Sequence, residues 1–172
     1  MNAAIRMLAI TAVGVALIAR ANFIAARPLL IWNATASMPV GLYRVATARD
    51  LRVGEYVLLR PDLDSARLFA ARGYLPIGVP LLKRIGAVAG QVVCEQDGRV
   101  SIDGLHIADA REHDGRGRPL RAWSGCHWLA ADELFVLVPD IRASLDGRYF
   151  GPSPVSSVIG RAIPIWMLGG RR

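Results

Sequence analysis

A serine and a lysine in this chain have the sequence surroundings that a nucleophile and a general base require. Ser37 lies among small and apolar neighbours, two residues before Pro39, which fixes its own φ and drives Met38 toward an extended conformation. Gly41 then permits a turn or a close approach of the backbone. The segment around Ser37 is therefore expected to be stiff and irregular, which suits a nucleophile and equally suits an ordinary linker serine.

Lys83 is the only lysine, because 20 of the 21 basic residues are arginine. Arginine cannot lose its proton in a protein, whereas a buried lysine can. Alternation along a strand places Lys83 on one apolar face with Leu81 and Ile85. Burial there can lower a lysine pKa from about 10.4 by roughly 3–5 units, which would give a base near neutral pH. The alternative is a strand lysine whose ammonium extends to solvent.

A Ser-His-Asp arrangement is the other route to an activated serine, and His106, His113 and His127 are its candidates. Cys94 and Cys126 lack CxxC spacing, so together with these scattered histidines they do not make a zinc site. We expect no metal and no cofactor, since no glycine-rich phosphate loop is present either. The two cysteines form either a structural disulfide or two free buried thiols, and the sequence leaves both open.

The N-terminal residues 1–32 predict a membrane anchor. Residues 7–19 are uncharged, but 13 helical residues reach only about 20 Å of a hydrocarbon core of roughly 30 Å. Extension to Ala26 gives about 30 Å, with Arg20 able to reach toward the interface. A retained anchor is favoured because the apolar character continues to Trp32, an aromatic residue typical of the interface. Cleavage of a signal peptide within residues 19–21 is the alternative.

Residues 33–172 predict a mostly β domain, a barrel or sandwich with one short helix. The chain has 17 glycines and 10 prolines between short apolar runs, and Asp-Gly pairs at Asp97 and Asp103 mark tight hairpins. Pro164 indicates an edge or a bulge in the last strand. The predicted strands are 41–46, 55–60, 81–85, 91–95, 99–102, 105–107, 127–130, 134–138 and 158–167.

The predicted helix covers residues 61–73. Asp62 or Asp64 would cap its N-terminus, Leu68 and Phe69 would face the core, and Gly73 would end it.

The formal net charge of +7 does not indicate nucleic-acid binding. The arginines are spread along the chain, and their densest group lies in the polar, glycine-rich segment 108–121, with only Trp123 nearby. We interpret this segment as a solvated loop. Contact with anionic lipid head groups is the favoured use of the surplus charge, given the predicted anchor.

Four stretches stand in a suggestive order behind the anchor: Ser37-Met38-Pro39, Lys83-Arg84, the run from Ser144 to Pro152, and Ile159-Gly160-Arg161. Together they resemble the type I signal peptidases, membrane-anchored serine proteases of peptidase family S26. The patterns Ser-x-Pro-x-Gly-x-Tyr and Asp-Gly-Arg-Tyr-Phe-Gly-Pro are similar to the TraF-type conjugative-transfer branch of that family. The resemblance extends from the anchor to Trp166.

The resemblance implies that Ser37 attacks the scissile carbonyl and that Lys83 takes its proton and later passes it to the leaving amine. Ser144 would hydrogen-bond and orient the lysine. The backbone N–H of Ser37 would stabilise the oxyanion, helped by the hydroxyl of Thr35, and such a donor is worth about 3–4 kcal/mol. Asp146 would support the site by pairing with Arg148 or with a neighbouring loop.

The implied function is that of a single-pass inner-membrane endopeptidase with a periplasmic catalytic domain. Its expected substrate is a conjugative pilin precursor or another exported preprotein with small residues before the cut, and ring closure of the product is a second possible outcome. Other transfer components are possible partners. A general signal peptidase and an inactive structural component are the alternatives.

The chain departs from the wider signal peptidases at two places. Val138-Pro139-Asp140 replaces their Gly-Asp-Asn, and Gly147 replaces a serine. Both departures agree with the TraF branch and argue against a housekeeping enzyme.

Overall fold

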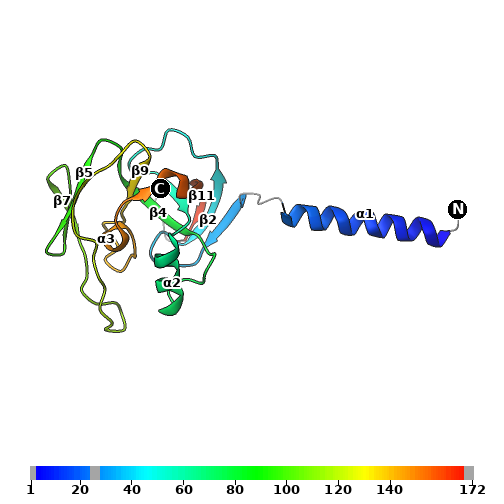
Figure 1. Ribbon diagram of the computed structural model, residues 1–172, viewed down its shortest axis with the longest axis horizontal. Coiled ribbons are helices and arrows are strands. Elements are labelled where there is room, and N and C mark those ends of the chain that lie inside the picture. The colour runs from blue at the N-terminus through cyan, green and yellow to red at the C-terminus, as the bar shows by residue number, and fades with distance from the viewer. Residues whose placement is uncertain (1–2, 24–27, 169–172) are drawn as a thin grey trace.

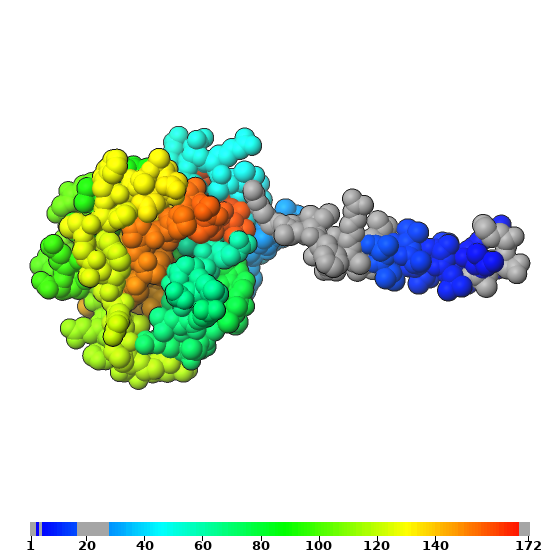
Figure 2. Space-filling model, viewed as in Figure 1, coloured from blue at the N-terminus to red at the C-terminus, as the bar shows by residue number. Residues whose placement is uncertain are grey.

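The computed structural model describes residues 3–23 and 28–168. A first helix, α1 (Ala3–Phe23), lies outside a β-rich body in Figures 1 and 2. Within these two ranges, no helix combines the length with the apolar content that a bilayer crossing requires. The membrane anchor therefore stays a prediction, and residues 1–2 and 24–27 of its predicted span lie outside the described ranges.

The β-rich body contains two antiparallel sheets. The larger has the order β1-β2-β11-β3-β4-β9-β10, and the smaller has the order β7-β6-β5-β8. Figure 1 shows α2 beside the larger sheet and α3 between the two sheets. The bounds are β1 Leu30–Asn33, β2 Gly41–Ala46, β3 Tyr56–Leu59, α2 Leu63–Ala71, β4 Leu81–Val88, β5 Val92–Gln96, β6 Arg99–Ile102, β7 Leu105–Asp109, β8 Gly125–Trp128, β9 Glu133–Val136, α3 Gly147–Phe150, β10 Ser153–Pro154 and β11 Val158–Met167, with a 3₁₀ turn at Val155–Ser157.

The fold is mostly β, as predicted, and several local predictions are confirmed. Both hairpins have the expected positive φ, 52° at Asp97 and 51° at Asp103, each followed by a positive-φ glycine. β11 has a register shift just after Pro164, which confirms the bulge. These features are fixed by local backbone chemistry, so the sequence is sufficient to predict them.

The structure corrects the predicted end of β4. The strand was expected to stop before Gly86, but it continues to Val88 with a register shift between Ile85 and Ala87. A Cβ at Gly86 would lie 2.8 Å from the Cβ of Leu137, so this glycine permits close packing and does not end the strand.

The predicted helix forms as α2 with Asp62 as its N-cap. The Asp62 carboxylate accepts hydrogen bonds from two backbone N–H groups of the first turn. Phe69 is buried as expected, but the prediction for Leu68 was wrong, because it is 46% exposed. Three further elements, β1, β10 and α3, were not predicted. β1 belongs to the larger sheet, so that sheet begins before residue 33.

The segment 108–121 is more ordered than a solvated loop. β7 continues to Asp109, and His113 and Pro119 form an isolated bridge. Asp114 accepts hydrogen bonds from the Tyr74 hydroxyl and, at 2.7 Å, from Nε of Arg118. The Arg118 guanidinium lies 5.0 Å from the centre of the Tyr74 ring. The segment thereby holds Tyr74, which lines the cavity described below.

Cys94 and Cys126 lie opposite each other on β5 and β8 and form a disulfide. Of the two alternatives that the sequence left open, the structure therefore has the structural disulfide. It lies in the smaller sheet and closes a loop between residues 32 positions apart.

Removing this disulfide should lower the free energy of unfolding by about 2–4 kcal/mol, because the unfolded chain loses a constraint. The measurement is urea denaturation of Cys94→Ala/Cys126→Ala against the oxidised wild type. The reduced wild type is the control and should match the variant. Equal stability of all three would contradict the expectation.

Candidate active site

Ser37 lies on a short loop, residues 34–40, which joins β1 to β2 and which we call the serine loop. The flanking strands pair Asn33 with Gly41. A Cβ at Gly41 would lie 2.2 Å from the carbonyl oxygen of Trp166, so only glycine allows β11 to approach. The buried Tyr43 hydroxyl donates to the carbonyl oxygen of Pro39 at 2.6 Å. The proline, glycine and tyrosine of the Ser-x-Pro-x-Gly-x-Tyr pattern thus hold the loop in place.

Lys83 is almost completely buried on β4, with 2% of its surface exposed. Its Nζ donates a hydrogen bond of 2.9 Å to Oγ of Ser144. Burial is the main cause that lowers its pKa, to about 8; the Asp146 carboxylate opposes the shift and the Arg148 guanidinium adds to it. Arg84, the next residue, is exposed. The predicted alternation on this strand is therefore confirmed at these two positions.

Ser144, Asp146 and Arg148 are all fully buried. The guanidinium of Arg148 donates two hydrogen bonds to the Asp146 carboxylate, at 2.8 and 2.9 Å. It also donates to the backbone carbonyl oxygens of Ile141, at 2.8 Å, and Ser144, at 3.2 Å. This ion pair fixes the segment 138–146, which we call the lysine-side loop, and with it the hydroxyl that accepts from Lys83.

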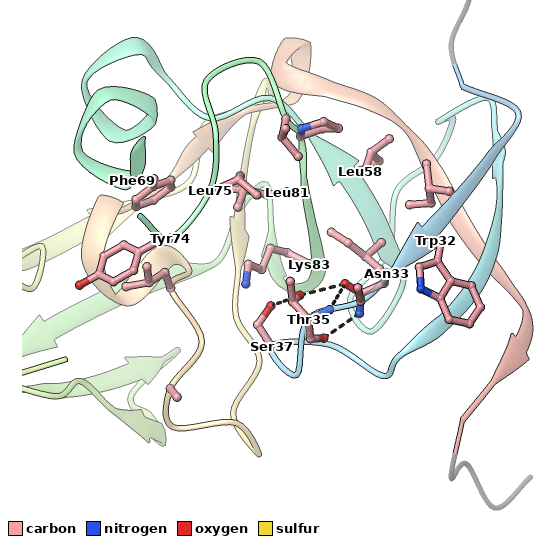
Figure 3. A pocket seen from close by; sticks show the side chains of 17 residues that line it. Trp32, Asn33, Thr35, Ser37, Leu58, Phe69, Tyr74, Leu75, Leu81 and Lys83 are labelled. Carbon is pink, nitrogen blue, oxygen red and sulfur yellow. Dashed lines mark hydrogen bonds between the residues drawn. The ribbon is translucent and has the colours of Figure 1, made fainter. Parts of the chain in front are cut away.

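A cavity of about 530 Å³ lies between the serine loop and the start of β4. Figure 3 shows the Lys83 side chain extending toward Ser37. Among the described residues, no hydrogen bond joins these two side chains; Oγ of Ser37 instead contacts Oγ1 of Thr35 at 3.1 Å. The remaining walls are largely apolar and include Ile31, Leu58, Phe69, Leu75, Val79, Leu81, Ala143 and Leu145.

The three histidines lie elsewhere. His106 contacts Asp109 on β7, and His127 of β8 contacts Glu133 of β9. Within the described part of the chain, no histidine lines the cavity, and Lys83 is its one basic lining residue. The structure thus brings together Thr35, Ser37, Lys83 and Ser144, with the Asp146–Arg148 pair behind them. Among the described residues, it places no histidine in the cavity that Ser37 lines.

Sequence reasoning missed Asn33. Its side chain is buried, lines the cavity and makes five hydrogen bonds to the serine loop. The available signal was an asparagine between an apolar run and a segment of small residues, a position where such side chains commonly bind nearby backbone.

Comparison with known proteins identifies the family of this protein. The family described as "Signal peptidase, peptidase S26" matches residues 3–167, so the chain belongs to this family. A probable conjugal transfer protein TraF of Sinorhizobium fredii is 38% identical over 140 residues, 76% of this chain and 73% of that protein. A plasmid transfer protein TraF of Escherichia coli is 33% identical over 150 residues, 78% of this chain and 82% of that protein.

A crystal structure of signal peptidase I from Enterococcus faecalis V583 is similar over 67% of this chain and 98% of that one. The sequence identity is 19% and the TM-score is 0.40.

The buried lysine should make stability depend on pH in a defined direction. Below pH about 8 the folded protein holds a buried ammonium, and this destabilises it by up to about 3 kcal/mol relative to the unfolded chain, whose lysine has the ordinary pKa of 10.5. The penalty disappears as the pH rises from 8 to 10.5. We therefore expect Lys83→Met to be more stable than wild type at pH 7 and to lose this advantage by pH 10.5.

The measurement is the free energy of unfolding of wild type and Lys83→Met at pH 7, 8, 9 and 10.5. Comparing the two proteins at each pH cancels the titration of other groups. Arg84→Met is the matched control, because that neighbour is exposed. A stability difference that does not change with pH would show that Lys83 has an ordinary pKa.

Proposed function

We propose that this protein is a membrane-bound serine endopeptidase that uses Ser37 as nucleophile and Lys83 as general base. The observation that carries the proposal is a buried lysine with a pKa of about 8 that lines the same cavity as a serine on a constrained loop. A lysine of this kind is partly neutral at physiological pH and can accept a proton. Membership of the signal peptidase family supports the same chemistry.

In the proposed reaction the Ser37 hydroxyl turns from Thr35 toward Lys83 and gives up its proton as Oγ attacks the scissile carbonyl. The backbone N–H of Ser37 and the Thr35 hydroxyl stabilise the oxyanion. The C–N bond then breaks, and the Lys83 ammonium returns the proton to the leaving amine. Ser144 holds Nζ in place through both proton transfers.

The acyl-enzyme that results can react with water or with an amine. Water gives a cleaved chain and restores the Ser37 proton. Attack by the amine at the substrate's own N-terminus gives a circular product, and it requires an acyl-enzyme that survives long enough in a site that excludes water. The largely apolar walls of the cavity support a site of low water content.

The proposed substrate is a conjugative pilin precursor or another exported preprotein. The conjugal transfer relatives support a transfer-related substrate. The proposed location is the inner membrane, with the N-terminal segment 1–32 as the single-pass anchor and the β-rich body in the periplasm, in contact with lipids and other transfer components. A general signal peptidase and an inactive component of the apparatus are the rival functions.

Ser37→Ala and Lys83→Met should each lower the cleavage rate by about 10³-fold or more, because removal of either member of a catalytic pair disables the unit. The measurement is cleavage of a pilin precursor in detergent, with the product mass recorded. A product lighter by one water than the linear mature chain would identify ring closure. Arg84→Ala, on the opposite face of β4, is the control and should keep full activity.

Full activity of Lys83→Met would refute the dyad. A wild type that cleaves neither this precursor nor unrelated preproteins would favour the inactive component, and cleavage of many unrelated preproteins would favour the general peptidase.

The pH dependence of kcat/KM is a second, independent test of the proposed base. The base is active when neutral, so kcat/KM should rise about tenfold per pH unit on the acid side and level off above pH about 8. Ser144→Ala removes an acceptor that favours the ammonium form of Lys83, so the acid limb of the pH profile of kcat/KM should move to lower pH. The maximal rate should fall as well. A limb that stays in place in Ser144→Ala would contradict this role for the hydroxyl.

A further inference from the structure

The serine loop is organised around a single buried side chain, that of Asn33. The loop begins immediately after this residue, at the end of β1. Its Nδ2 lies 2.9 Å from the carbonyl oxygen of Thr35 and 3.0 Å from those of Met38 and Pro39. Its Oδ1 accepts from the backbone N–H of Thr35 at 3.2 Å and from the Thr35 hydroxyl at 2.9 Å. Figure 3 shows the contacts between Asn33 and Thr35 on the wall of the cavity.

The neighbours of Asn33 determine which way its amide faces. Three carbonyl oxygens surround one end, and they can only accept hydrogen bonds, so that end must be the NH₂ group. The opposite orientation would place an oxygen against three oxygens and an NH₂ against the backbone N–H of Thr35. Oδ1 is therefore fixed as an acceptor that faces Thr35.

This orientation determines where the hydroxyl protons lie. The Thr35 hydroxyl has one proton, and it is donated to Oδ1 of Asn33, which has none to give. In the 3.1 Å contact between Thr35 and Ser37, the proton must then come from Ser37. The resting site contains an ordered chain of donors from Ser37 to Thr35 to Asn33, and the Ser37 proton is directed away from Lys83.

We infer that Asn33 is a positioning residue, which holds Thr35 Oγ1 beside Ser37 so that this hydroxyl becomes an oxyanion donor without movement of any heavy atom. The inference rests on the proposed function. Both the backbone N–H and the hydroxyl of Thr35 bind the same oxygen, which restricts its side chain to one rotamer. When the Ser37 proton leaves for Lys83, only the O–H bond of Thr35 has to rotate, from Asn33 to the nearby oxyanion.

Without Asn33, the exposed Thr35 side chain would be free to choose other rotamers, and its contribution to the rate would be lost. Thr35→Val keeps the shape and removes the hydroxyl, so in the wild-type background we expect kcat to fall about a hundredfold with KM within about threefold. In the Asn33→Ala background the same substitution should change kcat by less than about threefold. Thr35→Ser keeps the hydroxyl and should stay close to wild type.

Asn33→Asp supplies a matched comparison, because a buried carboxyl that faces three carbonyl oxygens is expected to stay protonated. It then keeps an acceptor for Thr35 and has one O–H donor in place of the NH₂ group. The Thr35→Val effect should persist in this background and disappear in Asn33→Ala. This pairing also protects the test if Asn33→Ala folds poorly, since Thr35→Val in wild type and in Asn33→Asp still gives an answer. Melting temperatures of all variants identify any loss of folding.

The experiment measures kcat and KM for the full-length chain in detergent, with a quenched fluorescent peptide that has alanines before the cut. Equal Thr35→Val effects in the wild-type and Asn33→Ala backgrounds would overturn the inference, as would loss of the effect in Asn33→Asp. Ser37→Ala distinguishes a failure of the proposed function from a failure of the role of Asn33. Cleavage by Ser37→Ala would refute the proposed function itself, whereas an inactive Ser37→Ala beside a fully active Asn33→Ala would refute the role of Asn33 alone.

Discussion

The burial of one amine is the constraint on which the rest of this structure depends. An ammonium group removed from water is costly, and the protein retains Lys83 because its neutral form is accessible near pH 8 and its Nζ has a hydroxyl to bind. A free carboxylate beside it would raise the pKa and keep the lysine charged. Asp146 is present, but Arg148 binds both of its oxygens, so the pair brings little net charge to Lys83.

The Asp146–Arg148 pair is therefore best understood as a means of fixing a loop. Its guanidinium gathers carbonyl oxygens of the lysine-side loop, and Asp146 also accepts from the backbone N–H of Val138 at 3.1 Å. Because both charged groups are fully buried, losing either would leave the other unpaired at a cost of about 3–5 kcal/mol. The serine loop is held by different means, with the neutral amide of Asn33. Each of the two loops that form the site is thus held by a buried polar group: the lysine-side loop by the Asp146–Arg148 pair, and the serine loop by Asn33.

The sequence predicts features that depend on local chemistry. The two Asp-Gly hairpins, the Asp62 cap and the apolar setting of Lys83 follow from turn, capping and alternation rules, and all three occur. The site assignment of Ser144 came from resemblance to a family, since a serine in a polar turn predicts nothing more than a turn. Asn33 was missed because its importance depends on five contacts that exist only once the serine loop has folded.

Errors at Gly86 and Leu68 have the same origin. A glycine inside an apolar run signals either an end or a close approach, and only the position of Leu137 decides between them. Leu68 and Phe69 are adjacent on a short helix and so point about 100° apart, which allows one to pack inward while the other faces solvent. The sequence alone does not say which of them packs inward. In each case local rules predict two alternatives, and tertiary contacts determine which of them occurs.

The separation of the two halves of the site also explains why the larger sheet must curve. Ser37 follows β1 and Lys83 lies on β4, and three strands separate β1 from β4 in the sheet order. In a flat sheet, four strand spacings would place β1 and β4 about 19 Å apart. Both residues nevertheless line one cavity, so the sheet must bring its β1 edge back toward β4.

The irregularities needed for this curvature lie in the strands between and beside the two. β11 shifts register against β2 after Pro164 and against β3 near Gly160, and β4 shifts against β9 at Gly86. Such bulges increase local twist and bend a strand. A Cβ at Gly160 would lie 2.6 Å from the carbonyl oxygen of Ala46, so a glycine is also needed where β11 lies against this end of β2. The proximity of serine and lysine therefore depends on backbone features at positions that take no part in the chemistry, and substitutions there would separate the two residues without touching either one.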